Sequence, residues 1–151
     1  MTYLVLDTET RSECDIKTAG AEAYARHAST ELIGLAGVYE DGAEFIWTPD
    51  QMMPRRLLAH VHDQLPIVMH NEPFDRNVWN WVIVDKINRL WPFMSPEHTD
   101  CTMVRAYAQG LPGSVEKLAI ALGLDIGKDT AGRALMLKMC KPLKKWRDEG
   151  T

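Results

Sequence analysis

The chain has 151 residues, of which 46% are hydrophobic and 25% charged, and these values are typical of one globular domain with a single core. It contains no run of about 18 apolar residues, which excludes a membrane-spanning helix, and a strand-like pattern begins too early for a signal peptide, so we expect a cytoplasmic protein. The net charge of −4 disfavours a general nucleic-acid binder, although residues 1–126 carry a net −8 and residues 127–151 a net +4.

The first half of the chain predicts three strands and a helix. The apolar run at 3–6 ends in Asp-Thr-Glu-Thr, as a buried strand does when it reaches a polar edge. Apolar runs at 31–39 and 43–47 are joined by Glu40-Asp41-Gly42, and Asp-Gly between such runs is typical of a β-hairpin. Apolar residues at helical spacing predict a helix within 51–64.

The second half predicts one more strand, followed by helices. Residues 66–70 form a short apolar run, after which Asn71 precedes Pro73, so we expect a helix that begins with Asn71 as its cap. Shorter helices are predicted over 100–109, 114–122 and 130–139. This order indicates an α/β fold in which helices flank a mixed central sheet.

Asp7 and Glu9 form the first candidate site. They are two residues apart on the first predicted strand, and the period of two places both carboxylates on the same face. Two such acids repel each other unless water or a cation separates them. Hard divalent cations prefer carboxylate ligands, but a D-x-E pair alone is a weak signal for metal binding.

Asp75 is the second candidate. In His70-Asn71-Glu72-Pro73-Phe74-Asp75 a short strand ends and a helix begins, which places Asp75 in the first helical turn. There the helix dipole favours an anion, so helix stabilisation by Asp75 is an alternative to metal binding.

Together these segments resemble a known family. Val5-Leu6-Asp7-Thr8-Glu9-Thr10 and His70 to Asp75 resemble the first and second motifs of DEDD (DnaQ-like) 3′–5′ exonucleases. Residues 23–31 and 111–119 are similar to the exonuclease part of phage-type family A DNA polymerases. The resemblance extends over almost the whole chain.

The resemblance implies an RNase H-like fold and a site for two divalent ions, Mg²⁺ or Mn²⁺. It implies that the ions are held by Asp7, Glu9 and Asp75, which would be the catalytic residues. The implied partners are the single-stranded 3′ end of DNA and a DNA polymerase domain or chain. Substrate-binding positions carried over from the motifs are Thr8, Thr10, Asn71 and Phe74, of which Phe74 is also expected to pack under the helix.

The family's third motif is absent from the sequence. That motif, Tyr-x-x-x-Asp or His-x-x-x-x-Asp on a late helix, supplies a fourth acid, and no matching copy occurs after the second motif. We therefore expect a single domain over 1–151 that is truncated before the third motif, with slow or absent chemistry. A second chain supplying the missing acid is an open alternative.

The leading hypothesis is thus a proofreading-like 3′–5′ exonuclease that hydrolyses DNA phosphodiesters with two metal ions. One alternative is an inactive module of the same fold that binds nucleic acid or a partner protein. Another is an exonuclease that trims RNA. The basic tail, with Lys138, Lys141, Lys144, Lys145 and Arg147, is consistent both with phosphate contacts and with a solvated helix.

Other potential metal ligands have simpler interpretations. His60 and His62 face different ways on a helix, and His70 is expected to be a packed strand end. The three cysteines lack CxxC spacing and predict reduced thiols rather than a disulfide framework or a zinc site.

Overall fold

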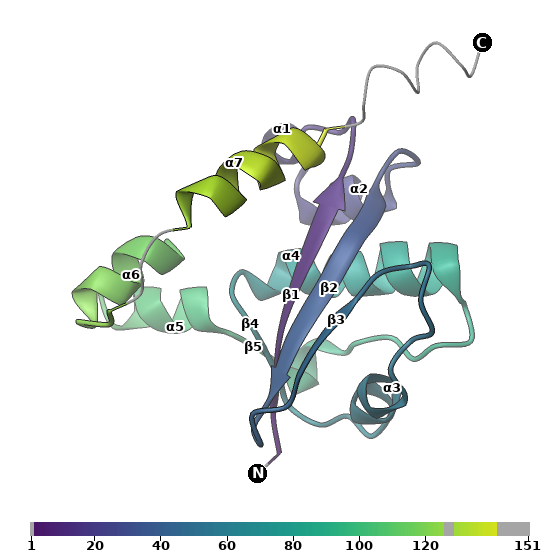
Figure 1. The fold of residues 1–151 in the computed structure, drawn as a ribbon, viewed down its shortest axis with the longest axis horizontal. Helices are drawn as coiled ribbons and strands as arrows, with labels where there is room; N and C mark the ends of the chain where they lie inside the picture. Colours follow the sequence, from purple (N-terminus) through teal and green to yellow (C-terminus); the bar gives the residue numbers. More distant parts are fainter. Residues whose placement is uncertain (1, 126–128, 142–151) are drawn as a thin grey trace.

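A five-stranded sheet forms the centre of the molecule in the computed structural model, which describes residues 2–125 and 129–141 (Figure 1). Its order is β3-β2-β1-β4-β5. The pairs β1–β2 and β2–β3 are antiparallel, whereas β1–β4 and β4–β5 are parallel. This mixed arrangement confirms the predicted α/β fold with a mixed central sheet and is consistent with the expected RNase H-like architecture. The strands are β1 (Leu4–Arg11), β2 (Glu31–Tyr39), β3 (Glu44–Trp47), β4 (Ile67–Met69) and β5 (Thr99–Cys101).

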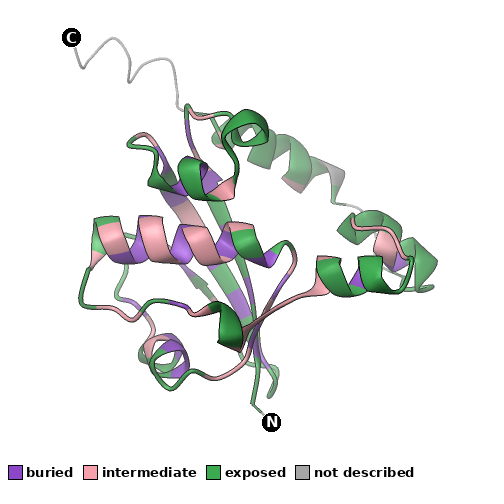
Figure 2. Cartoon of the chain, turned by 180° about the vertical axis from the view of Figure 1, so that it is seen from behind, coloured by how far each residue is buried: buried purple, intermediate pink, exposed green. Residues whose placement is uncertain are grey.

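Helices α4 and η1 pack against one face of the sheet, and α2 packs against both of these helices. Figure 1 shows α4 and its continuation η1 crossing behind β1 and β2, and Figure 2 shows buried residues recurring along this long helix. The helices are α1 (Ile16–Ala19), α2 (Ala21–Arg26), α3 (Arg55–His62), α4 (Glu72–Val78), the π-helix η1 (Trp79–Ile87), the 3₁₀-helix η2 (Pro96–His98), α5 (Thr102–Ala108), α6 (Val115–Ala121) and α7 (Thr130–Met139).

Alternation along β1 separates the core from the opposite face of the sheet. Leu4 and Leu6 are buried in the core with Trp47 and Trp79, while Val5 remains 42% exposed. On the neighbouring strand Val38 pairs with Val5 and is 41% exposed. Asp7 and Glu9 share this exposed face, because successive side chains of a strand point to opposite sides.

Several predicted boundaries differ from the structure. The predicted helix over 100–109 begins only at Thr102, because residues 99–101 form β5 by pairing with β4. The first strand, predicted to carry the apolar run at 3–6 and the acids Asp7 and Glu9, continues to Arg11, since β2 pairs with its polar half as well. Helices α1 and α2 were not predicted.

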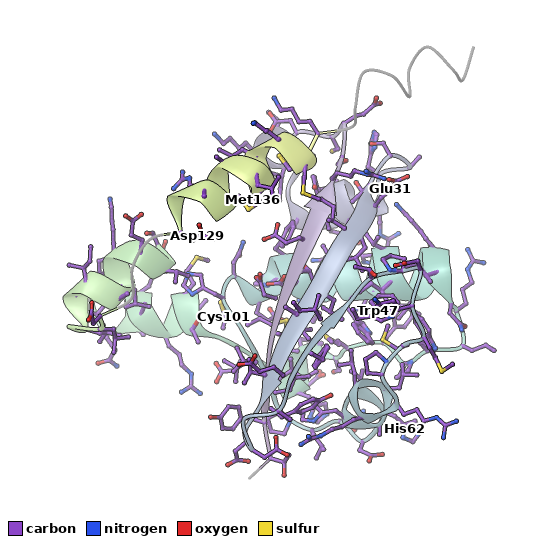
Figure 3. The ribbon with its side chains drawn as sticks, in the orientation of Figure 1. Glu31, Trp47, His62, Cys101, Asp129 and Met136 are labelled. Atoms are coloured by element: carbon purple, nitrogen blue, oxygen red, sulfur yellow. The ribbon has the colours of Figure 1, made fainter. Side chains whose placement is uncertain are left out.

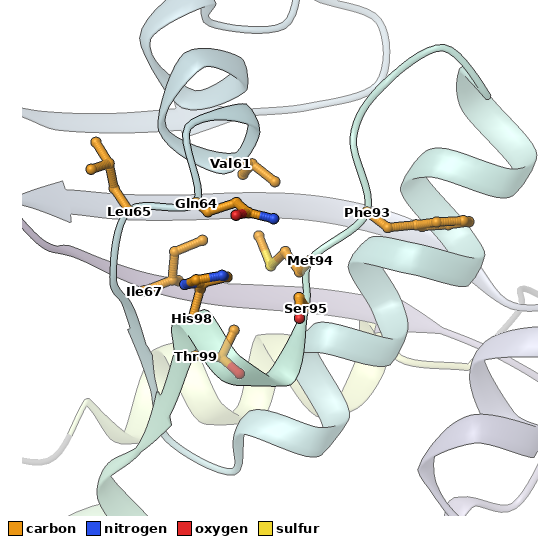
Figure 4. Close-up of a pocket in the computed structure, with 9 residues that line it drawn as sticks. All are labelled: Val61, Gln64, Leu65, Ile67, Phe93, Met94, Ser95, His98 and Thr99. Carbon is orange, nitrogen blue, oxygen red and sulfur yellow. The ribbon is translucent and has the colours of Figure 1, made fainter.

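A small pocket lies between the end of α3, the start of β4 and the segment before β5 (Figure 4). Ile67 lines it from the amino end of β4, together with Val61 and His98. It therefore lies at the opposite end of β4 from His70 and Asn71.

Among the described helices, none is long and apolar enough to cross a membrane. The three cysteines are free thiols. Of the basic tail, Lys138 and Lys141 are described, whereas Lys144, Lys145 and Arg147 lie outside the described residues.

Candidate carboxylate site

Strand β1 presents Asp7 and Glu9 on its exposed face, as the period of two predicts. Thr8, between them, points to the opposite side and is 5% exposed. The pairing of β1 with β2 shifts register between Glu9 and Thr10. Such a bulge bends and twists a strand locally, so the two carboxylates lie immediately before a change in the direction of β1.

Asp75 joins these residues from α4. It is 2% exposed, and its Oδ1 accepts two hydrogen bonds from Thr8, one from the backbone N–H at 3.1 Å and one from the hydroxyl at 2.5 Å. Two donors on one carboxylate oxygen fix both its position and its orientation. The structure thus links the two predicted motifs through a residue 67 positions away in the chain.

The turn before α4 is tight. Asn71 occupies the position preceding the helix with φ 65° and ψ 55°, in the left-handed region that asparagine tolerates better than most residues. Its carbonyl accepts from the N–H of Phe74 at 3.0 Å. The prediction that the Asn71 side chain caps the helix is wrong, because no capping hydrogen bond forms from this conformation. The exposed side chain remains available at the edge of the site.

Burial and mutual repulsion disfavour ionisation of the three carboxyl groups. The pKa of Asp75 is raised to about 7, chiefly by burial, while the charges of Asp7 and Glu9 raise it and the Thr8 hydrogen bonds lower it. Partial burial raises the pKa of Asp7, which the positive charge of His70 opposes. The pKa of Glu9 is raised by partial burial and then by Asp7. The three groups are therefore close enough to interact through their charges.

The remaining predicted substrate residues face the interior. The Thr10 hydroxyl is hydrogen-bonded to the Tyr24 hydroxyl at 2.8 Å, and the ring of Phe74 packs 5.8 Å from that of Tyr24. Phe74 thus packs against the core as expected. The side chains of Thr8 and Thr10 are therefore buried and hydrogen-bonded, and the backbone N–H of Thr8 is bound to Asp75.

Sequence reasoning missed the role of Glu72. This glutamate is 8% exposed, and its Oε1 accepts from Arg76 Nε and, at 2.6 Å, from the Thr99 hydroxyl. It therefore fastens the start of α4 to β5, one turn from Asp75. The sequence indicates that Glu72 lies in the first turn of a helix. It does not indicate the hydrogen bond to Thr99 of β5.

The carboxylates do not form a closed ligand set as placed. Within residues 2–125 and 129–141, no group of three or more His, Cys, Asp or Glu side chains lies close enough to hold a metal ion. Their chemistry nevertheless fits a hard divalent cation, because three mutually repelling oxygen donors gain from a shared positive charge. The residues that would hold such an ion are Asp7, Glu9 and Asp75.

Comparison with known proteins relates the chain to DNA polymerases. A DNA polymerase of Bacillus phage SP02 is 31% identical over 150 residues, which cover 95% of this chain and 22% of the polymerase. The chain therefore spans about a fifth of the length of this relative. The expected similarity to a phage DNA polymerase is thus confirmed, for one part of such a protein.

Two further comparisons add no family. No protein-family model matches the chain. The family B DNA polymerase of the archaeon Pyrobaculum calidifontis aligns with 78% of this chain and 12% of its own, at a TM-score of 0.34 and 20% identity. A TM-score of this size does not establish a shared fold.

Proposed function

We propose that the chain is a metal-dependent 3′–5′ exonuclease domain that removes nucleotides from DNA 3′ ends. The observation that supports this function best is the approach of Asp7, Glu9 and Asp75, from two distant segments, to within electrostatic range of one another. Perturbed carboxyl groups that gather at one point are typical of functional sites. Similarity to part of a phage DNA polymerase supports the same proposal.

In this proposal the three acids hold Mg²⁺ or Mn²⁺. Divalent ions bound to such a site activate a water and stabilise the leaving 3′ oxygen during phosphodiester hydrolysis. Thr8 keeps Asp75 in place with two hydrogen bonds, so that the carboxylate does not need to reorganise when its charge is required. The backbone at Thr8 and Thr10 and the exposed Asn71 side chain face the terminal nucleotide, while Phe74 supports this turn from below.

A second candidate function is a module that binds single-stranded DNA or a partner protein without cleaving. One observation favours it: the carboxylates of the described chain do not converge into a ready ligand set. An exonuclease specific for RNA is a variant of the first proposal that differs only in its substrate.

Incubation with a 5′-labelled single strand and Mg²⁺ or Mn²⁺ separates these functions. The wild-type protein is compared with Asp7→Asn and with the control Asp41→Asn, whose carboxylate lies on the hairpin and pairs with Arg56 at 2.8 Å. The exonuclease proposal expects a ladder that shortens from the 3′ end, is lost with EDTA and with Asp7→Asn, and persists with Asp41→Asn. A 3′-terminal phosphorothioate should slow the first cleavage.

Other outcomes decide between the alternatives. An intact strand that is bound in a gel-shift assay supports the binding module, and an intact, unbound strand contradicts both functions. Cleavage of an RNA strand but not of the matched DNA strand supports the RNA variant. If the rate per molecule rises with protein concentration, a second chain contributes to the site.

A further inference from the structure

His70 connects the candidate site to the helices that follow the sheet. It stands at the carboxyl end of β4, close enough to Asp7 that the imidazole lowers the pKa of that carboxyl when the ring is protonated. Its Nδ1 is 2.8 Å from the Thr102 hydroxyl, at the start of α5, and its Nε2 is 2.6 Å from the carbonyl of Gly113, just before α6. One half-buried imidazole therefore contacts two segments of the following helices and interacts electrostatically with Asp7.

The helices α5 and α6 and the turn between them, residues 102–121, are called the helical arm here. Figure 1 shows the arm projecting from the sheet beyond β5. Only Ala106 is buried in α5 and only Ala119 in α6 among the described residues, while Val104, Tyr107, Val115 and Ile120 are more than half exposed. Burial of apolar surface is the main favourable term in packing. Because the arm buries little apolar surface, its hydrogen bonds to the sheet contribute a larger share of its stability.

The hydrogen bonds of His70 are prominent among these links. The Thr102 hydroxyl also lies 3.4 Å from the carbonyl of Met69, which is the alternative acceptor for its single hydrogen. Gly113 is also fixed from the other side, because a Cβ added to it would lie 2.2 Å from the Tyr107 hydroxyl oxygen. Gly113 therefore lies against Tyr107 of α5, while its carbonyl is bound by His70 of the sheet.

The partners of His70 define its protonation. A carbonyl oxygen only accepts hydrogen bonds, so Nε2 carries a hydrogen and donates to Gly113. A hydroxyl either donates or accepts, so in the neutral ring Nδ1 accepts from Thr102. The geometry thus specifies the Nε2–H tautomer of the neutral imidazole.

We propose that His70 is a positioning residue that tethers the helical arm to the carboxylate site, so that the turn at 110–114 forms a wall beside the bound DNA 3′ end. The tether consists of the hydrogen bonds of His70 with the Gly113 carbonyl and the Thr102 hydroxyl, and it does not depend on bound DNA. The wall rests on the proposed function, because it needs a strand bound at Asp7, Glu9 and Asp75.

Hydrogen–deuterium exchange tests the tether without metal or DNA. The variants are His70→Ala, His70→Gln, whose amide nitrogen can again donate to Gly113, and Thr102→Val, which removes the hydroxyl alone. The control is His62→Ala, because the His62 side chain is 79% exposed and lies on α3, far from Cys101 at the base of the arm (Figure 3).

We expect exchange in residues 102–121 to rise about tenfold in His70→Ala and about threefold in Thr102→Val, from the net worth of two bonds and of one. Residues of β1, β2 and β3 should keep wild-type exchange. His70→Gln should restore most of the protection, and His62→Ala should change nothing. If His70→Ala does not fold, Thr102→Val decides alone. Unchanged exchange in the arm, or an equal rise throughout the sheet, overturns the tether.

Two more measurements separate tether and wall. Nitrogen-15 spectra of the histidine rings should show the Nε2–H tautomer for His70 at high pH, and the other tautomer would contradict the assigned bonds. Binding of a 5′-fluorescent oligothymidylate, with Ca²⁺ in place of Mg²⁺, should weaken about tenfold in His70→Ala and recover in His70→Gln. Wild-type affinity in His70→Ala, with a loosened arm, overturns the wall. If the wild-type protein binds no strand, the proposed function fails, whereas exchange still decides the tether.

Discussion

Thr8 donates two hydrogen bonds to a single oxygen of Asp75, and it does so from the face of β1 opposite to Asp7 and Glu9. The residue between two exposed acids thus controls a third acid that is almost fully buried. The two faces of β1 therefore have different roles. One face presents Asp7 and Glu9, and the other binds Asp75 of α4 through Thr8.

Replacing Thr8 by valine tests this control. Thr8→Val keeps the shape of the side chain and the backbone bond but removes the hydroxyl donor to Asp75. We expect a loss of about 1–2 kcal/mol in the free energy of unfolding at neutral pH, together with a higher pKa of Asp75, since the lost bond favours the carboxylate. Denaturant titration and carboxyl carbon-13 shifts measure both. Thr8→Ser, which retains a hydroxyl, should keep the pKa close to that of the wild type, and an equal shift in both variants would contradict the role of the bond.

The pH dependence of stability follows from the same group. The pKa of Asp75 is about 7 in the folded protein, against 3.8 ordinarily. Between these values the folded state binds more protons than the unfolded state, so stability is fully present below about pH 4 and falls as pH rises toward 7. The raised pKa values of Asp7 and Glu9 have the same sign.

Asp75→Asn should remove most of this pH dependence, because its neutral amide oxygen accepts the same two bonds at any pH. We expect the variant to match the wild type below about pH 4 and to exceed it by about 1–3 kcal/mol at pH 8. Thermal unfolding followed by circular dichroism from pH 4 to 9 provides the measurement. A wild-type stability that rises between pH 5 and 7, by an amount that Asp75→Asn abolishes, would show that the sign is wrong.

Two Glu–Arg pairs with the same i, i+4 spacing offer a direct comparison of buried and exposed ion pairs. Glu72 and its partner Arg76 have side chains 10% and 23% exposed, whereas Glu22 and Arg26 are 63% and 52% exposed. Glu72→Ala leaves Arg76 and the Thr99 hydroxyl without their acceptor and should cost about 2–4 kcal/mol. Glu22→Ala should cost less than about 0.5 kcal/mol. Chemical denaturation of both variants checks the contrast, and equal costs would contradict it.

Two glycines of β2 differ in the space around them. A Cβ at Gly37 would lie 2.5 Å from the Phe45 ring and 3.1 Å from Leu4 Cδ1, whereas one at Gly34 meets only ordinary contacts from 3.7 Å. We therefore expect Gly37→Ala to destabilise the protein by about 1–3 kcal/mol. Gly34→Ala should be neutral or slightly stabilising, because alanine loses less backbone entropy on folding. The midpoints of urea unfolding compare the two, and a neutral Gly37→Ala would mean that Phe45 moves aside freely.

Local patterns predicted the strands β1, β2, β3 and β4 but not β5. The hairpin of β2 and β3 follows from two apolar runs around Asp41 and Gly42, and the structure places Gly42 at φ 84°, as such a turn requires. β5 has no comparable signal, because the three residues Thr99–Cys101 become a strand only by pairing with β4. A strand that depends on a partner more than 30 residues away is not visible in its own sequence.

The candidate site was also predicted only in part. The alternation of a strand predicts that Asp7 and Glu9 share one face, and the helix start predicts that Asp75 lies in a first turn. The bonds of Thr8 to Asp75 and of His70 to Gly113 join residues 67 and 43 positions apart, and they depend on how α4 and the arm settle on the sheet. Sequence periodicity carries no information about such contacts.

The parallel pairing of β1 with β4 also has a consequence for folding. The antiparallel β1–β2 pair closes a loop of some 20 residues, from Arg11 to Glu31, whereas Leu4 must find Ile67 before the parallel pair can form. Because closure of long loops slows folding, we expect the first strand and its hairpin to assemble before Asp75 arrives. The charge repulsion among the three acids would then arise only in the last stage, when the rest of the sheet already compensates for it. In pulsed-labelling experiments the amide of Thr8, which binds Asp75, should therefore become protected later than the amides that pair β2 with β3.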